Sequence, residues 1–131
     1  MQEHPNAVAA RAGLEAFVAG DLETLVGLFA DDLVWHAPGT NRFSGKFVGK
    51  QEWLERTGRM REAGIELTFD VHDVVANDEH VVALVEVHLE NAARQRYDGP
   101  QVQVMHVRDG IVREFWGMNQ DQAAADLIMG S

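Results

Sequence analysis

The chain has 131 residues, which suits one domain, and its apolar fraction of 46% and charged fraction of 24% are ordinary for a globular protein. It contains no cysteine, which excludes disulfide bridges, a thiolate nucleophile and cysteine-ligated metal sites. The net charge of −10 disfavours nucleic acids and anionic membranes as partners, because both are bound through Lys and Arg side chains that neutralise phosphate groups. We therefore expect a single domain over residues 1–131.

Two helices are predicted at the start of the chain. Pro5 suits a first helical position and Gly20 suits the residue after a last turn, so the first helix is expected over residues 5–19. Asp21 is a typical N-cap, and the apolar residues behind it recur at helical spacing as far as Phe29. The two helices should form a corner with a joint of one or two residues.

A short strand and a third helix are predicted next. The strand is expected over residues 33–37, because Pro38-Gly39 stops it and opens a loop that continues through Gly49. Residues 50–63 are predicted to form the helix. Its three arginines alternate with glutamates and predict a solvated face; they are Arg56, Arg59 and Arg61.

The second half of the chain has the texture of strands. Apolar and polar residues alternate over 65–72, and further strands are expected over 81–89, 101–108 and 111–118. Asp109-Gly110 is the strongest hairpin signal, since a tight primed turn needs positive φ at both positions. Asn119 and Gln122 form a capping-box pattern that would open a last helix over 120–129. Helices followed by a meander of strands indicate an α+β domain whose curved sheet can enclose a cavity.

The last hairpin decides which residues could face that cavity. A two-residue turn would place Met105 opposite Glu114 and Gln103 opposite Trp116 on one face of the sheet. With Met118, this set offers adaptable apolar surface and a few polar groups, so we expect it to form the concave, pocket-facing side. The other face would be a dimer side formed by Val104, His106, Ile111, Arg113 and Phe115. A shift of one residue in the register would exchange the two faces.

Three ionisable residues are candidates for acid/base chemistry. His36 lies beside Trp35 on the first strand, where a neutral imidazole could exchange a proton near pH 7 or could simply bond to a backbone carbonyl. Glu114 beside Trp116 could act as a desolvated general acid or base, or could form a salt bridge with an arginine. Asp121 could be catalytic or could only favour the start of the last helix. The six histidines show no metal-ligand spacing such as HExxH, so no metal site is expected.

Several segments resemble the SnoaL-like group of the nuclear transport factor 2-like superfamily. They are residues 20–21, 32–36, 38–39, 47–50 and 107–116, with Asp121 beyond. The resemblance implies a cone with a deep apolar cavity, homodimerisation through the outer face of the sheet, and no metal or organic cofactor. It also implies chemistry by carboxylates or histidines, and Asp121 matches the region where polyketide cyclases of the group place an acid/base aspartate.

The resulting hypothesis is a cone-shaped α+β barrel with a curved, mixed or mostly antiparallel sheet, about three N-terminal helices and a short C-terminal helix. It would bind a small, mostly apolar molecule and act on it as a cofactor-free cyclase, isomerase or epoxide hydrolase. Glu114 and Asp121 would shuttle protons, His36 would polarise or relay, and Trp35 would help to shape the pocket. The alternative is a non-catalytic dimeric binding module. A cytoplasmic location is expected, because neither a secretory signal nor about 18 consecutive apolar residues is present.

Overall fold

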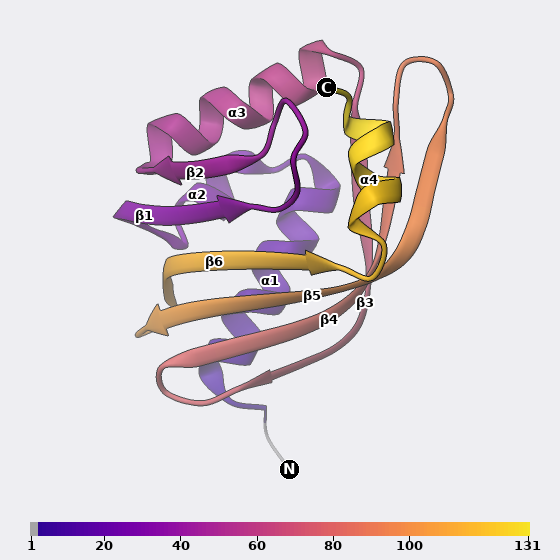
Figure 1. The fold of residues 1–131 in the computed structure, drawn as a ribbon. Helices are drawn as coiled ribbons and strands as arrows, with labels where there is room; N and C mark the ends of the chain where they lie inside the picture. The colour runs from indigo at the N-terminus through magenta and orange to yellow at the C-terminus, as the bar shows by residue number, and fades with distance from the viewer. Residues whose placement is uncertain (1–2) are drawn as a thin grey trace.

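The computed structural model describes residues 3–131, which form four helices on the inner side of a curved six-stranded sheet (Figure 1). The elements in chain order are α1 (Pro5–Ala19), α2 (Leu22–Val26), β1 (Phe29–Ala37), β2 (Gly45–Val48), α3 (Lys50–Glu62), β3 (Glu66–Ala76), β4 (His80–Glu90), β5 (Arg96–Arg108), β6 (Ile111–Asn119) and α4 (Gln122–Met129). The strand order is β2-β1-β6-β5-β4-β3, and the pair β1 and β6 is parallel whereas the other neighbours are antiparallel. The predicted α+β class is confirmed. No helix within residues 3–131 is both long and apolar enough to cross a membrane.

The helical corner at the start of the chain is confirmed. Gly20 takes the left-handed conformation with φ 78° and donates its N–H to the last turn of α1. Asp21 caps α2, where its carboxylate accepts the N–H of Thr24 at 3.1 Å. The predicted second helix was too long, because α2 ends at Val26 and Phe29 already begins β1.

Two segments predicted as loops form strands. The loop after Ala37 contains β2, which pairs with β1, and β5 begins at Arg96 although the segment before residue 101 is polar. Both stretches are held by backbone hydrogen bonds to a neighbouring strand, which their side chains do not signal. Tyr97 therefore lies in a strand, where it is buried and its hydroxyl accepts the N–H of Asp121 at 3.2 Å.

The last hairpin has the predicted turn but a different register. Asp109 and Gly110 both have positive φ, 52° and 79°, as a primed turn requires. Val107 faces Val112, as a two-residue turn requires. The next pair is His106 with Glu114, so Arg113 is an extra residue in β6. This β-bulge moves every later residue of β6 by one position.

The bulge corrects the predicted faces of the sheet. Met105 faces Phe115 rather than Glu114, and Gln103 faces Gly117 rather than Trp116. Because side chains alternate along a strand, the three predicted pocket residues of β6 lie on the outer face instead. They are Glu114, Trp116 and Met118.

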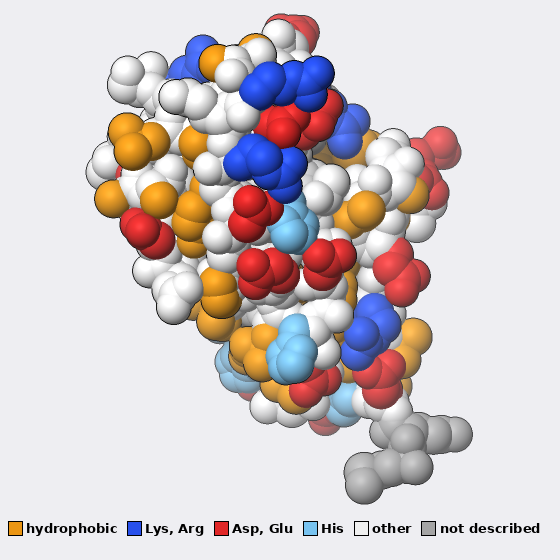
Figure 2. All heavy atoms as spheres, turned by 90° about the vertical axis from the view of Figure 1, so that its right-hand side faces the viewer, with side chains coloured by type: hydrophobic (Ala, Val, Ile, Leu, Met, Phe, Trp, Pro, Cys, Tyr) orange, Lys and Arg blue, Asp and Glu red, His pale blue; other side chains and the backbone are white. Residues whose placement is uncertain are grey.

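The surface carries the charges that give the chain its net charge of −10. On the face shown in Figure 2, acidic side chains lie among Arg or Lys and His side chains. One network on β3, β4 and β5 joins His88 to Asp98 and Asp70, and Arg96 to Asp98 and Glu90. Hydrogen bonds that the carboxylates of Asp98 and Asp70 accept from the imidazole raise the pKa of His88. These ion pairs occupy the outer side of the sheet.

Asn6 fixes α1 to two turns of the sheet. Its buried amide nitrogen donates to the carbonyls of Asn77 and Asp78 at 3.0 and 3.2 Å, and its amide oxygen accepts the N–H of Gly110 at 2.9 Å. The turns β3–β4 and β5–β6 are thereby held at the start of α1. This arrangement keeps α1 across the inner face of the sheet.

Replacing Asn6 by alanine should lower the free energy of unfolding by about 2–3 kcal/mol, because three hydrogen bonds are lost and the backbone groups that formed them lose a hydrogen-bond partner. Glu15→Ala, at an exposed position of the same helix, should change it by less than about 0.5 kcal/mol. Urea unfolding followed by circular dichroism measures both values. Equal stability of the two variants would contradict the anchoring role of Asn6.

Candidate ligand-binding site

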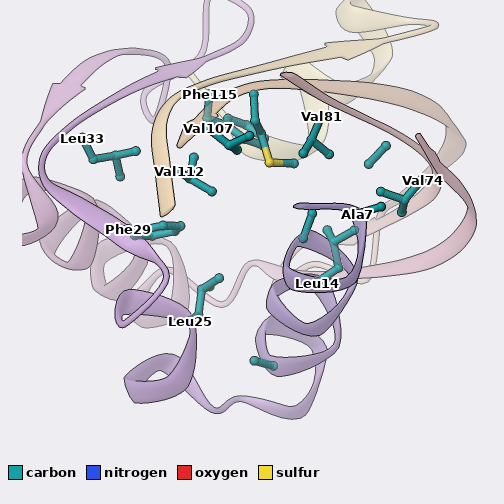
Figure 3. Packing of buried hydrophobic residues seen from close by; sticks show 14 of the residues in the cluster. Ala7, Leu14, Leu25, Phe29, Leu33, Val74, Val81, Val107, Val112 and Phe115 are labelled. Carbon is teal, nitrogen blue, oxygen red and sulfur yellow. The ribbon is translucent and has the colours of Figure 1, made fainter. Parts of the chain in front are cut away.

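A cavity of about 110 Å³ lies between the first three helices and the inner face of the sheet. One water needs only about 10–15 Å³ of such space, so the cavity can hold a small organic molecule. Figure 3 shows Leu14 of α1 and Leu25 of α2 opposite Val107, Val112 and Phe115 of the sheet. The predicted apolar pocket is therefore present, and its wall is mainly aliphatic and aromatic.

Four aromatic side chains form one side of this wall. Trp35 stacks on Phe115 with ring centroids 3.7 Å apart and planes inclined by 9°. Trp53 meets Trp35 and Phe29 edge-on at 5.6 and 5.1 Å. Such packed rings have few alternative rotamers, so they present a fixed apolar surface to a ligand.

Arg56 brings a positive charge to the cavity lining, and its predicted place on a solvated helix face is wrong. Its side chain is buried with 8% exposure, whereas Arg59 on the same helix is exposed. The Nε–H of Arg56 donates to the carbonyl of Phe43 at 2.8 Å. In the described part of the chain, no carboxylate forms an ion pair with this guanidinium. Burial, and secondarily the charge of Arg59, lower the pKa of Arg56 to about 10.

Trp53 lies three residues before Arg56 on the same side of α3, and its side chain also lines the cavity. Its indole Nε1–H is enclosed by the protein and has no hydrogen-bond partner among residues 3–131, so the ring contributes apolar wall rather than a donor. The positive end of the cavity is therefore formed by Arg56 of α3.

Three of the sequence-predicted site residues line the cavity. They are Trp35, Gln103 and Met105. Gln103 is almost fully buried, and its amide donates to Gln101 at 2.9 Å, which in turn donates to Asn119 at 2.9 Å. This chain of amides fixes the only polar side chain that β5 contributes to the lining within residues 3–131.

His36 and Glu114 are brought together, but on the outer face of the sheet. His36 Nε2 lies 2.7 Å from Glu114 Oε2, and the imidazole stacks on Trp116 at 4.9 Å. His106 Nδ1 lies 3.4 Å from the other oxygen of Glu114. The parallel pairing of β1 with β6 causes this arrangement. It places His36 beside Trp116 on the outer face, whereas the preceding residue, Trp35, points inward. Around this cluster, no group of three or more residues able to hold a metal is found in residues 3–131.

Asp121 and Met118 also lie outside the cavity lining. Asp121 is the N-cap of α4, and its carboxylate accepts the N–H of Ala124 at 3.0 Å. The predicted cap, Asn119, instead donates to the side chain of Gln122. The helix-start interpretation of Asp121 thus accounts for its contacts.

The lining is mainly apolar and poor in proton acceptors. Among the residues that the structure describes, it includes no aspartate, glutamate or histidine. Arg56 was the residue that reading the sequence missed, although a signal was present. Trp53, Thr57 and Met60 repeat at helical spacing, and position 56 falls within the same buried stripe.

The Phe43 carbonyl, which accepts the hydrogen bond of Arg56, belongs to a loop that α4 holds in place. Asp126 of α4 accepts hydrogen bonds from the Asn41 amide at 2.8 Å, the Gln122 amide at 2.9 Å and the Thr40 N–H at 3.2 Å. Partial burial acts to raise the pKa of Asp126, but these hydrogen bonds together outweigh it and lower the pKa. The loop that contains Phe43 is therefore fixed by an ionised carboxylate.

Because the folded state lowers the pKa of Asp126, its stabilising effect should be complete above the pKa of an unfolded aspartate, near 3.9, and should disappear as pH falls below it. Asp126→Asn should cost about 1–2 kcal/mol at pH 7, and this difference from the wild type should shrink towards pH 3. Thermal unfolding at a series of pH values measures it. A difference that is independent of pH would argue against a role for the carboxylate charge.

The chain is similar to a known protein family and to several solved structures. The family described as "SnoaL-like domain" matches residues 10–115. No curated protein matches the chain. Solved structures do: Bal32a, from a soil-derived mobile gene cassette, has 28% sequence identity and a TM-score of 0.86, and 95% of each chain is covered.

Two further structures are similar in fold. TerC, crystallised with polyporic acid, has 17% identity and a TM-score of 0.86, covering 98% of this chain and 100% of its own. IdmH from Streptomyces antibioticus, a suggested polyketide cyclase, has 22% identity and a TM-score of 0.72, with 96% of each chain covered. The same fold occurs in a nuclear transport factor 2-like protein from Burkholderia pseudomallei, so the predicted fold is confirmed.

Proposed function

The chain belongs to the SnoaL-like domain family, and from this we propose that it binds a small, mostly apolar molecule in the cavity beneath the sheet. The observation that carries the proposal is the lining itself, which is apolar apart from a few donor groups from α1, α3 and β5. Ligand sites commonly combine such a wall with a small number of placed polar groups. The co-crystallisation of TerC with polyporic acid and the suggested cyclase activity of IdmH support a small organic ligand.

We place binding ahead of acid/base catalysis. His36 and Glu114 lie on the outer face, and Asp121 caps α4, so none of the three predicted acid/base residues borders the cavity within residues 3–131. A general base must come within hydrogen-bond reach of the proton that it removes. Any reaction in this cavity would instead depend on polarising a ligand oxygen with the donors of α3.

Filling the cavity should weaken binding. Ala10→Phe would place a ring in the cavity from α1, since Ala10 is buried in the lining. We expect affinity for a neutral apolar probe, 3-phenylpropan-1-ol, to fall by about tenfold or more, because the ligand and the new ring compete for the same volume. Isothermal titration calorimetry measures the affinity.

The matched control is Ala12→Phe, an exposed position on the same helix. This variant should bind the alcohol as the wild type does. If Ala10→Phe bound the alcohol as tightly as Ala12→Phe, the cavity would not be the binding site.

We also propose that a second copy of the chain covers the outer face of the sheet. Leu84, Val102 and Met118 are cross-strand neighbours there, with exposures of 36%, 36% and 49%. Val104 and the half-buried Trp116 form the adjacent row. A contiguous apolar patch on a sheet face is typical of an interface, and a two-fold dimer is the commonest closed arrangement.

Placing a charge in the middle of this patch should separate the copies. Val102→Glu should shift the mass measured by size-exclusion chromatography with light scattering from dimer to monomer, because two carboxylates would be buried near the two-fold axis. Val8→Glu, at an exposed valine of α1, should leave the mass unchanged. A wild type that is monomeric at high concentration would refute the dimer.

A further inference from the structure

We infer that the ligand of the cavity is an apolar molecule with one anionic oxygen group, a carboxylate or an enolate, which accepts hydrogen bonds from Arg56. This inference rests on the proposed function, since it assigns the polar end of a molecule whose apolar part lies in the same cavity. It assigns no reaction. It specifies which class of small molecule the cavity recognises.

The first argument is the incomplete pairing of Arg56. A guanidinium has five N–H donors, and among residues 3–131 only the Nε–H of Arg56 forms a hydrogen bond, to the carbonyl of Phe43, while the guanidinium carbon lies 5.6 Å from the centre of the Phe47 ring. With 8% exposure it is largely removed from water, and no carboxylate within residues 3–131 compensates its charge. The remaining donors form the planar fork that binds a carboxylate through two hydrogen bonds.

The second argument is the apolar wall next to Arg56. Trp53 and Arg56 share one side of α3 and line the same cavity. The indole N–H of Trp53 is enclosed by the protein and lacks an acceptor among residues 3–131, so Trp53 offers a ligand its ring and not a donor. The apolar body of the ligand would therefore lie against Trp53, and its anionic oxygen against Arg56.

The net charge of −10 disfavours an anionic ligand, but it does not set the electrostatic potential inside the cavity. Charges exposed on the surface are screened beyond about 8 Å at physiological salt. The lining itself, as far as residues 3–131 define it, carries no acid and includes the exposed Arg61 at its border. The local potential in the cavity is therefore set by arginine.

The test compares two probes with the same apolar body, 3-phenylpropionate and 3-phenylpropan-1-ol, by isothermal titration calorimetry with the full chain. The wild type should bind the carboxylate about 10–100-fold more tightly than the alcohol, as expected for charge-assisted hydrogen bonds. Arg56→Met should remove most of this preference, so that the two affinities differ by less than about threefold. Arg59→Met, on the exposed side of α3, should keep the preference.

The wild-type comparison needs no variant and stands even if Arg56→Met does not fold. Equal affinity of the wild type for both probes would overturn the inference and leave the proposed function intact. Binding of neither probe would overturn both.

Discussion

The extra residue in β6 determines what each face of the sheet offers. Without the bulge at Arg113, strict alternation would turn Glu114 and Trp116 inward and Phe115 outward. With it, Phe115 stacks on Trp35 in the cavity wall, and Glu114 meets His36 on the other side. The apolar character of the cavity, and the absence of acids from the part of the lining that residues 3–131 form, both follow from this single irregularity.

Much of the fold could be predicted because its signals are local. Pro5, Gly20 and the pair Asp109-Gly110 act through backbone preferences that neighbouring residues do not alter. The bulge could not be predicted, because a polar residue such as Arg113 fits an outward position in either register. The start of β5 was missed for a related reason, since its polar side chains face outward and the backbone pairing with β4 leaves no signal in the sequence.

At the candidate site, the charge of one residue led to a wrong prediction of its position. Arg56 belongs to the buried stripe of α3 by spacing, but its charge favoured an interpretation as solvated surface. A buried guanidinium without a carboxylate is costly to the folded chain, and such costs are concentrated at functional sites. The surrounding structure supports it: α4 holds the loop of Phe43 through Asp126, and the Phe43 carbonyl holds the guanidinium.

The parallel pairing of β1 and β6 has a consequence for how the protein is made. β1 lies in the first third of the chain and β6 close to its end, so the contact between Trp35 and Phe115 joins distant parts of the sequence. During synthesis, the cavity wall stays open until β6 has left the ribosome. Such non-local pairing slows folding, and in this interval β1 presents an unpaired edge that other chains can join.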